Sequence, residues 1–183
     1  MIFSDMYGIE FLLIFFTGFN ACYLMDLAGI CNSHKGVEYY GQIHQTTQNI
    51  IVHVIGMPFT VYGILLWVPT LVMCTPENAW QVQVGLYLLY LGHYIRMDLE
   101  TTKYFVLMYS PAVLLSFVTY TPGLYGFGIG FAISFVALVF QEVIGHYMSG
   151  DKASRIEGVP NAVLYAIYFS ADSLKRLVQG DLH

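Results

Sequence analysis

Charged residues are scarce in this sequence of 183 residues. Asp, Glu, Lys and Arg together make up only 10% of the chain, against roughly 25% in ordinary soluble domains. The seven basic residues are scattered and the net charge is −5, which argues against a nucleic-acid partner. Because 57% of the chain is hydrophobic and a bilayer admits backbone mainly as helices, the sequence predicts an all-α integral membrane protein.

Cysteines and recognised catalytic motifs are also few. The three cysteines form no CxxC pair, so a disulfide framework is not expected. The chain contains no GxSxG, no phosphate-binding P-loop and no HExxH motif, which argues against serine hydrolases, P-loop nucleotidases and HExxH metalloproteases. The residues left for chemistry are histidines and uncharged polar side chains within apolar segments.

Several apolar runs approach or reach the length of a membrane-crossing helix, which takes about 17–25 residues. They occupy residues 9–30, 49–73, 80–95, 104–121, 124–147 and 159–174. The sequence therefore predicts one membrane domain over residues 1–183, a polytopic helical bundle with five to six transmembrane segments. The last run is short and either spans or lies in the interface. The first has no basic residue before it and is expected to be retained as a membrane helix rather than removed as a signal peptide.

Lysine and arginine mark one face of the predicted bundle. They occur in the connections after the first, third and fifth runs, at Lys35, Arg96, Lys103, Lys152 and Arg155. The alternate connections, 74–79 and 122–123, carry none. Since basic residues favour the cytosolic side of a membrane, this face is predicted to be cytosolic.

Four histidines fall at the same face. His44 and His53 begin the second run, His93 ends the third, and His146 ends the fifth. Polar groups inside membrane helices are costly and usually face the bundle interior or a functional cavity. We therefore expect the histidines to converge on one metal site, with His44, His53, His146 and His93 as candidate ligands.

Helical geometry separates the two histidines of the second run. Nine residues correspond to about 900° of α-helix, so His44 and His53 would point in opposite directions on one regular helix. If both serve one site, His44 precedes the helix, and Thr46 or Thr47 is its N-cap. Asn49 lies one turn before His53 and shares its face.

A second polar face lies at the end of run 124–147. Glu142 and His146 are four residues apart, so they share a helix face, and Gln141 lies beside them. Side chains near a metal ligand often orient it through hydrogen bonds, and the candidates for this role are Asn49, Gln141 and Glu142. Two or three histidines with a carboxylate suit non-haem iron, and zinc accepts the same ligands.

Two stretches of the sequence carry a family resemblance. Residues 39–63, YYGQIHQTTQNIIVHVIGMPFTVYG, combine an aromatic pair, a histidine, an asparagine, a second histidine, a glycine and a proline. Residues 139–158, VFQEVIGHYMSGDKASRIEG, supply a glutamine, a Gly-His pair and a charged loop. They resemble the signatures of the fungal-type 2-hydroxy-fatty-acid dioxygenases, a family of small multi-span proteins of the endoplasmic reticulum membrane. The family-like core is residues 39–178, preceded by the extra segment 9–30.

The resemblance implies an iron(II)-dependent oxygenase. Family members shorten 2-hydroxy fatty acids by one carbon with molecular oxygen, a step of fatty acid α-oxidation. The signature histidines correspond to His44, His53 and His146 here, which the resemblance makes the Fe2+ ligands. The Phe-Glu pair that commonly follows the Gly-His in this family is absent, and Asp151 and Glu157 are the nearby candidates for its carboxylate.

Two other interpretations fit the residues taken alone. A non-catalytic membrane scaffold would use the histidines only for hydrogen bonds between helices. Paired histidines on separate helices can also ligate a haem, which would make the chain an electron carrier. Membrane lipids are expected partners in every case and a homo-oligomer stays open, whereas the oxygenase adds a fatty acyl substrate and molecular oxygen.

Overall fold

All regular structure is helical in the residues that the computed structural model describes, which are 13, 16–17, 19–21, 23–29, 33–72, 74–152 and 159–181. The elements are α2 (Ser33–Ile43), α3 (Thr47–Leu71), α4 (Ala79–Met97), α5 (Leu99–Thr119), α6 (Gly123–Phe140), the π-helix η1 (Gln141–Tyr147) and α7 (Val159–Gln179). No strand occurs among the described residues. The predicted all-α class is confirmed.

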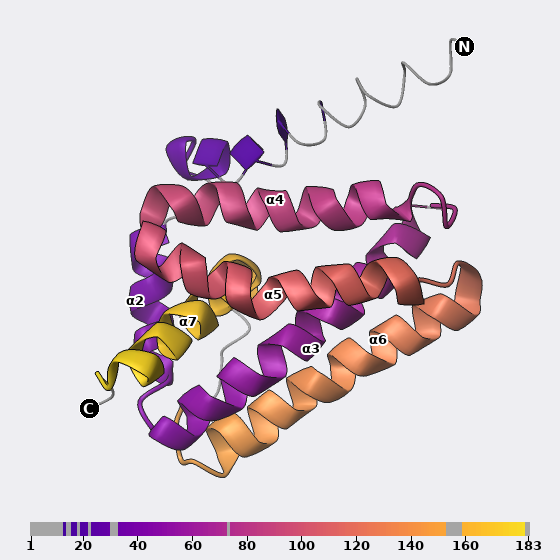
Figure 1. The fold of residues 1–183 in the computed structure, drawn as a ribbon. Helices are drawn as coiled ribbons and strands as arrows, with labels where there is room; N and C mark the ends of the chain where they lie inside the picture. Colours follow the sequence, from indigo (N-terminus) through magenta and orange to yellow (C-terminus); the bar gives the residue numbers. More distant parts are fainter. Residues whose placement is uncertain are drawn as a thin grey trace.

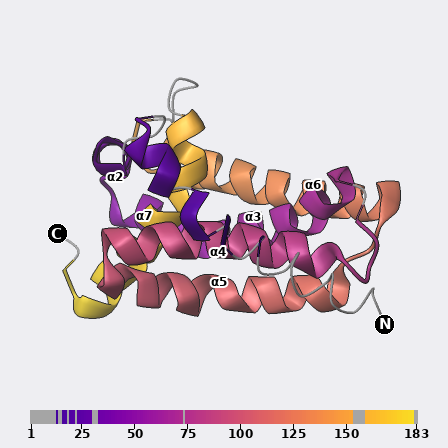
Figure 2. The same ribbon diagram turned by 90° about the horizontal axis from the view of Figure 1, so that it is seen from above.

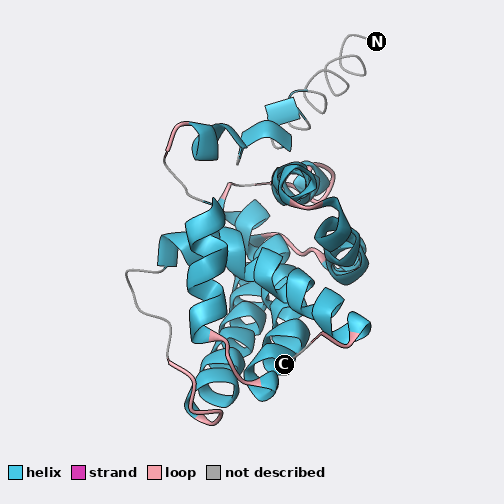
Figure 3. Ribbon diagram, turned by 90° about the vertical axis from the view of Figure 1, so that its left-hand side faces the viewer, coloured by secondary structure: helices cyan, strands magenta, loops and turns pink. Residues whose placement is uncertain are grey.

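The helices α3 to α6 run back and forth beside one another (Figure 1). As a result, the start of α3, the turn between α4 and α5, and the end of η1 gather at one end of the bundle. The helices α2 and α7 lie at this end too, as Figures 1 and 2 show from two directions. Figure 3 views the molecule from this end, which we call the histidine end because His44 and His146 lie there.

Within the described part of the chain, three helices are long and apolar enough to cross a membrane: α3, α5 and the continuous helix of α6 and η1. The expected count of five to six spans is not confirmed. Helix α4 carries polar residues, of which the fully buried Gln83 donates hydrogen bonds to the carbonyls of Leu65 (3.0 Å) and Ser116 (3.3 Å). Helix α7 is charged near its C-terminal end. Part of the run 9–30 lies outside the described residues.

Helices α3 and α6 pack closely because two glycines meet between them. A Cβ atom added at Gly63 would lie 2.6 Å from the carbonyl oxygen of Gly130, and one at Gly130 would lie 2.8 Å from Cβ of Leu66. Small residues of this kind let membrane helices approach one another. Nearby, Trp67 donates a hydrogen bond to Oγ of Ser134 (3.1 Å). This close seam brings the first turns of α3 beside η1.

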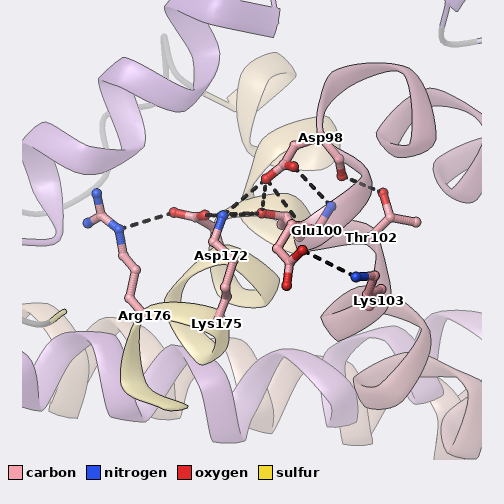
Figure 4. A network of polar contacts seen from close by, with 8 residues as sticks. Asp98, Glu100, Thr102, Lys103, Asp172, Lys175 and Arg176 are labelled. Carbon is pink, nitrogen blue, oxygen red and sulfur yellow. Dashed lines mark hydrogen bonds and ion pairs between the residues drawn. The ribbon is translucent and has the colours of Figure 1, made fainter. Parts of the chain in front are cut away.

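Helix α7 is held at the histidine end by polar contacts with α4 and α5. Lys175 forms ion pairs with Asp98 (3.0 Å), at the turn between α4 and α5, and with Asp172 (2.7 Å), one turn earlier in α7 (Figure 4). The fully buried Tyr109 of α5 shares a hydrogen bond with Ser170 of α7 (2.7 Å between oxygens). These contacts fix the helix that covers the site described below.

Helix α2 occupies a segment in which the sequence analysis expects only a connection. Its residues Tyr40 and Ile43 are buried, and Gly36 faces the ring of Tyr165 in α7. A helix of this length is marginal by itself, so its contact with α7 stabilises it. The end of α2 places His44 directly before α3.

Candidate metal centre

Three of the four candidate histidines come together at the histidine end. His44 follows α2, His53 lies in the second turn of α3, and His146 lies in η1. All are buried, with exposed fractions of 3%, 6% and 1%. One ring nitrogen from each lies within 4.8 Å of the others, so that the group can hold a metal ion.

The start of α3 explains how His44 and His53 meet despite their spacing. Thr46 is the N-cap, in an extended conformation, and its side chain accepts a hydrogen bond from the backbone N–H of Asn49 (3.2 Å). His44 therefore precedes the helix, as predicted, and its ring turns back over the first turns of α3. The ring centroids of His44 and His53 are 4.3 Å apart.

The π-helix η1 brings His146 onto the buried face. In an α-helix Gln141 and His146 would be about 140° apart. The wider turn of η1 instead buries Gln141, Gly145 and His146 together, while Glu142 is exposed. Such π-helical turns are frequent at functional sites.

The hydrogen bonds of His44 and His53 place a proton on the outer nitrogen of each ring. Nδ1 of His44 donates to the carbonyl of Tyr40 (2.8 Å), and Nδ1 of His53 donates to the carbonyl of Asn49 (3.0 Å). A carbonyl can only accept a hydrogen bond, so each Nδ1 carries its ring's proton. Burial and the neighbouring His53 lower the pKa of His44 to about 3, so this ring is neutral at physiological pH.

The inner nitrogens of these two rings then face each other without a proton between them. Nε2 of His44 and Nε2 of His53 are 3.2 Å apart, and both present lone pairs in a buried setting. Nε2 of His146 is also buried and has no hydrogen-bond partner among the described residues. Buried polar atoms are normally satisfied, and a cation between the rings would satisfy the two facing lone pairs of His44 and His53. His146 would add a third lone pair through whichever ring nitrogen does not carry its proton.

The separation of the inner nitrogens fits adjacent ligands of one ion. Imidazole nitrogens bind zinc at about 2.0–2.1 Å, so two ligands at roughly 90–109° are about 2.8–3.4 Å apart. The observed 3.2 Å between His44 and His53 lies in this range. Axial haem ligands lie on opposite sides of the iron, about 4 Å apart, so this pair does not have haem-ligand spacing.

Asp151 and Asn49 tie the loop after η1 to the start of α3. Oδ2 of Asp151 accepts hydrogen bonds from the backbone N–H groups of Gln45 and Thr46 and from Oγ1 of Thr46, each at 3.0 Å. It also accepts one from Nδ2 of Asn49 (2.9 Å), which lies 3.3 Å from Nδ1 of His146. Burial would raise the pKa of Asp151, but these hydrogen bonds outweigh it and lower the pKa. The ionised carboxylate therefore supports the histidines through Asn49, while Glu157 lies outside the described residues.

Three residues singled out from the sequence lie apart from the ring nitrogens. Nε2 of Gln141 donates to Oγ1 of Thr60 and to the carbonyl of Ala137, each at 2.9 Å, so Gln141 joins η1 to α3 one turn deeper in the bundle. The side chain of Glu142 is exposed because η1 turns it outward. His93 lies on α4, near the rings of Tyr94 and Tyr165, and is not part of the histidine group.

Two aromatic side chains enclose the group, and the sequence analysis assigned neither to it. The ring of Tyr40 stacks on His44, with centroids 5.3 Å apart and planes 19° apart. Phe169 of α7 lies 4.7 Å from the same ring. The aromatic pair before His44 was visible in the sequence, whereas nothing there indicates that Phe169, 125 positions later by number, covers the same ring.

Comparison with known proteins finds no matching family model, no matching curated protein and no matching solved structure. The resemblance to the 2-hydroxy-fatty-acid dioxygenases therefore rests on the two stretches of sequence described above.

Proposed function

We propose that this chain is a membrane-embedded iron(II)-dependent dioxygenase that shortens 2-hydroxy fatty acids by one carbon. The observation that carries the proposal is the buried pair of unprotonated nitrogens, Nε2 of His44 and Nε2 of His53, 3.2 Å apart, beside the unpartnered Nε2 of His146. The sequence resemblance supports iron and the substrate. It also supports a place in the endoplasmic reticulum membrane, and the placement of lysine and arginine supports a histidine end toward the cytosol.

The donor set suits a metal that must also bind other molecules. Three imidazoles leave coordination positions open, and imidazole ligands suit iron as well as zinc. Iron(II) would supply the redox chemistry that activation of molecular oxygen requires. The electrons released by oxidising a 2-hydroxy acid to the shortened acid and carbon dioxide match those needed to reduce oxygen to water, so no separate reductant is required.

Charge favours an anionic substrate at this centre. His44 and His53 are neutral donors, and the carboxylate of Asp151 bonds to the start of α3 rather than to the group. A divalent ion held by neutral ligands in a buried site keeps an uncompensated charge, which is costly at low dielectric. A 2-hydroxy carboxylate would offset this charge with two oxygens in chelating positions.

The chain's own residues hold the rings and limit access of water. The carbonyls of Tyr40 and Asn49 fix the tautomers of His44 and His53, which leaves Nε2 of each ring free to bind metal. Phe169 covers the outer face of His44. These contacts preorganise the donors before a metal or a substrate binds.

The proposal is tested with full-length protein purified without oxygen and loaded with Fe(II). We expect close to one iron per chain by mass spectrometry. We also expect oxygen uptake with 2-hydroxyhexadecanoic acid, but not with hexadecanoic acid, and pentadecanoic acid as the product. Protein that cannot be loaded with iron, or that holds iron and consumes no oxygen with the hydroxy acid, would contradict the proposal.

A further inference from the structure

An open apolar groove lies between α3 and α6, below the histidine group. Its volume is about 520 Å³, and its walls include Ile55, Gly56 and Phe59 of α3 and Ala132, Val136 and Phe140 of α6. This volume is within the range of about 300–1,000 Å³ typical of small-molecule sites. Every side chain that lines it is apolar.

A second groove continues past Phe59. It has a volume of about 420 Å³ and lies among α3, α5 and α6, with Pro58, Tyr62 and Pro111 in its walls. The two grooves share Phe59 and Ile133. Phe59 therefore stands at the boundary between them.

Both grooves lie on the membrane-facing surface of the helices. Their walls belong to α3, α5 and α6, the three helices that are long and apolar enough to cross a membrane. Side chains in these walls such as Phe59 and Val136 are exposed, so in a bilayer both grooves open toward lipid chains. A ligand drawn from the membrane can enter them sideways.

One end of the first groove lies near the metal centre. Gly56 follows His53 by three residues, which is about 4.5 Å along the axis of an α-helix. At the other wall, Phe140 directly precedes η1, which carries His146. A molecule lying in the groove would thus have its upper end within about one helical turn of His53.

We propose that the groove between α3 and α6 binds the tail of the fatty acid whose carboxylate end reaches the histidine group. The proposal rests on the proposed function and adds the residues that recognise the tail. The first groove extends along α6 from Ala132 to Phe140, eight residues or about 12 Å of helix. A longer tail must pass Phe59 into the second groove, so Phe59 limits the length of tail that binds well.

Two valines of α6 provide a matched test of the groove. Val136 lines it and Val139 does not, although both are exposed (65% and 43%) on the same helix.

The probe is 2-hydroxyhexadecanoic acid with a photoreactive diazirine near the middle of its tail, added to full-length protein in phosphatidylcholine nanodiscs. Labelled peptides are located by mass spectrometry, and unlabelled 2-hydroxyhexadecanoic acid is used as competitor.

We expect competable labelling of the α3 and α6 segments around Phe59 and Val136. Val136→Trp fills the groove and should weaken competition by at least about tenfold, the scale expected for steric exclusion from an apolar site. Val139→Trp should leave competition by the unlabelled acid unchanged. Labelling that is spread around the helices, resists competition, or is equally affected by the two variants would identify ordinary bilayer contact and overturn the proposal.

A second pair of variants tests the boundary. Phe59 and Phe135 are similarly exposed (56% and 55%), but only Phe59 lines the grooves. Phe59→Ala should shift the best competitor toward longer 2-hydroxy acids, and Phe135→Ala should not. An unchanged chain-length profile in Phe59→Ala would overturn the role given to this residue.

The labelling does not depend on turnover, so the two proposals can fail separately. Competable labelling of the groove in protein that neither binds iron nor consumes oxygen would retain the tail site and reject the dioxygenase. Iron-dependent oxygen uptake together with labelling elsewhere would retain the dioxygenase and reject the tail site.

Discussion

Two polar clusters lie at the histidine end, and they differ in how their atoms are paired. The charged cluster lies between the α4–α5 turn and α7 and includes Asp98, Asp172, Lys175 and Arg176 (Figure 4). Thr101 joins it through hydrogen bonds to Asp98, Asp172 and Lys175. The histidine group consists of His44, His53 and His146. Both are drawn from segments far apart in the sequence, but only the first is complete by itself.

The charged cluster balances its own charges. Two carboxylates face two cations, and Nζ of Lys175 reaches Asp98, Asp172 and Oγ1 of Thr101 at 3.0, 2.7 and 2.6 Å. Thr101 also lies 2.6 Å from a carboxylate oxygen of Asp98. No ligand is needed to satisfy these groups, so the cluster has a structural role in holding α7.

The histidine group instead gathers acceptors without donors. The outer nitrogens of His44 and His53 are satisfied by backbone carbonyls, whereas their inner nitrogens face each other. The difference suggests a general criterion. A buried polar cluster that neutralises itself stabilises a fold, and one that leaves lone pairs converging is built to receive a cation.

The largest expected effect comes from removing a ring of the histidine group. His53→Ala or His146→Ala should reduce bound iron to background and abolish oxygen uptake, a greater loss than the roughly 10–100-fold expected when a partner of a ligand is removed. Metal analysis per folded chain measures the effect. His93→Ala is the matched control, since His93 is also buried but lies outside the group. Loss of iron from the control and not from His53→Ala would reverse the assignment.

The next effect comes from crowding the group without removing a ligand. A Cβ at Gly145 would lie 2.7 Å from Oδ1 of Asn49 and 3.0 Å from Cε1 of His53. Gly145→Ala should therefore displace both side chains and weaken iron binding by about 10–100-fold, measured by competition with a chelator.

Gly128→Ala is the control for this substitution. Gly128 lies on α6, with nothing within 4 Å of an added Cβ. The alanine should leave iron affinity unchanged and alter stability by no more than about 0.5–1 kcal/mol in the favourable direction. Equal iron affinity in Gly145→Ala and Gly128→Ala would show that the close approach of η1 to α3 does not set the geometry of the group.

The features of the site and fold that depend on local helix geometry could be predicted from the sequence. The angle of about 900° between His44 and His53 on a regular helix correctly placed His44 before α3, and Thr46 is the N-cap as predicted. Both features depend only on neighbouring residues. The runs 104–121 and 124–147 correspond closely to α5 (Leu99–Thr119) and to α6 with η1.

Other features depend on contacts that periodicity does not encode. Glu142 was placed beside His146 by assuming an α-helix, but the segment is a π-helix and the carboxylate points outward. Membrane topology put His93 at the correct end of the bundle but could not give its lateral position. Helix α2 was missed because it is stabilised by α7 rather than by its own sequence.

Breaking the charged cluster should lower the stability of the fold without emptying the metal site. Lys175→Met leaves the carboxylates of Asp98 and Asp172 without their shared cation and should destabilise the fold by about 1–3 kcal/mol, less than a fully buried pair because the cluster is partly exposed. Lys103→Met is the control, since the exposed pair of Lys103 and Glu100 (3.2 Å) is worth about 0–1 kcal/mol. Thermal unfolding in detergent measures both. If Lys175→Met emptied the iron site as fully as His53→Ala, the two clusters would form one unit.

The smallest expected effect is a pH dependence of stability that belongs to the charged cluster and not to the histidine group. Hydrogen bonding from Thr101, together with Lys175, lowers the pKa of Asp98 from 3.8 to about 2. A carboxylate with a lowered folded-state pKa contributes stability above its unfolded pKa and loses it as the pH falls through the folded value. The difference in melting temperature between wild type and Asp98→Asn should therefore be constant above about pH 5 and shrink between about pH 4 and 2. Protons compete with a metal for imidazole, so the pH at which iron is released should be the same in Asp98→Asn as in wild type. A shift of this pH in Asp98→Asn would mean that the histidine group and the charged cluster are not independent.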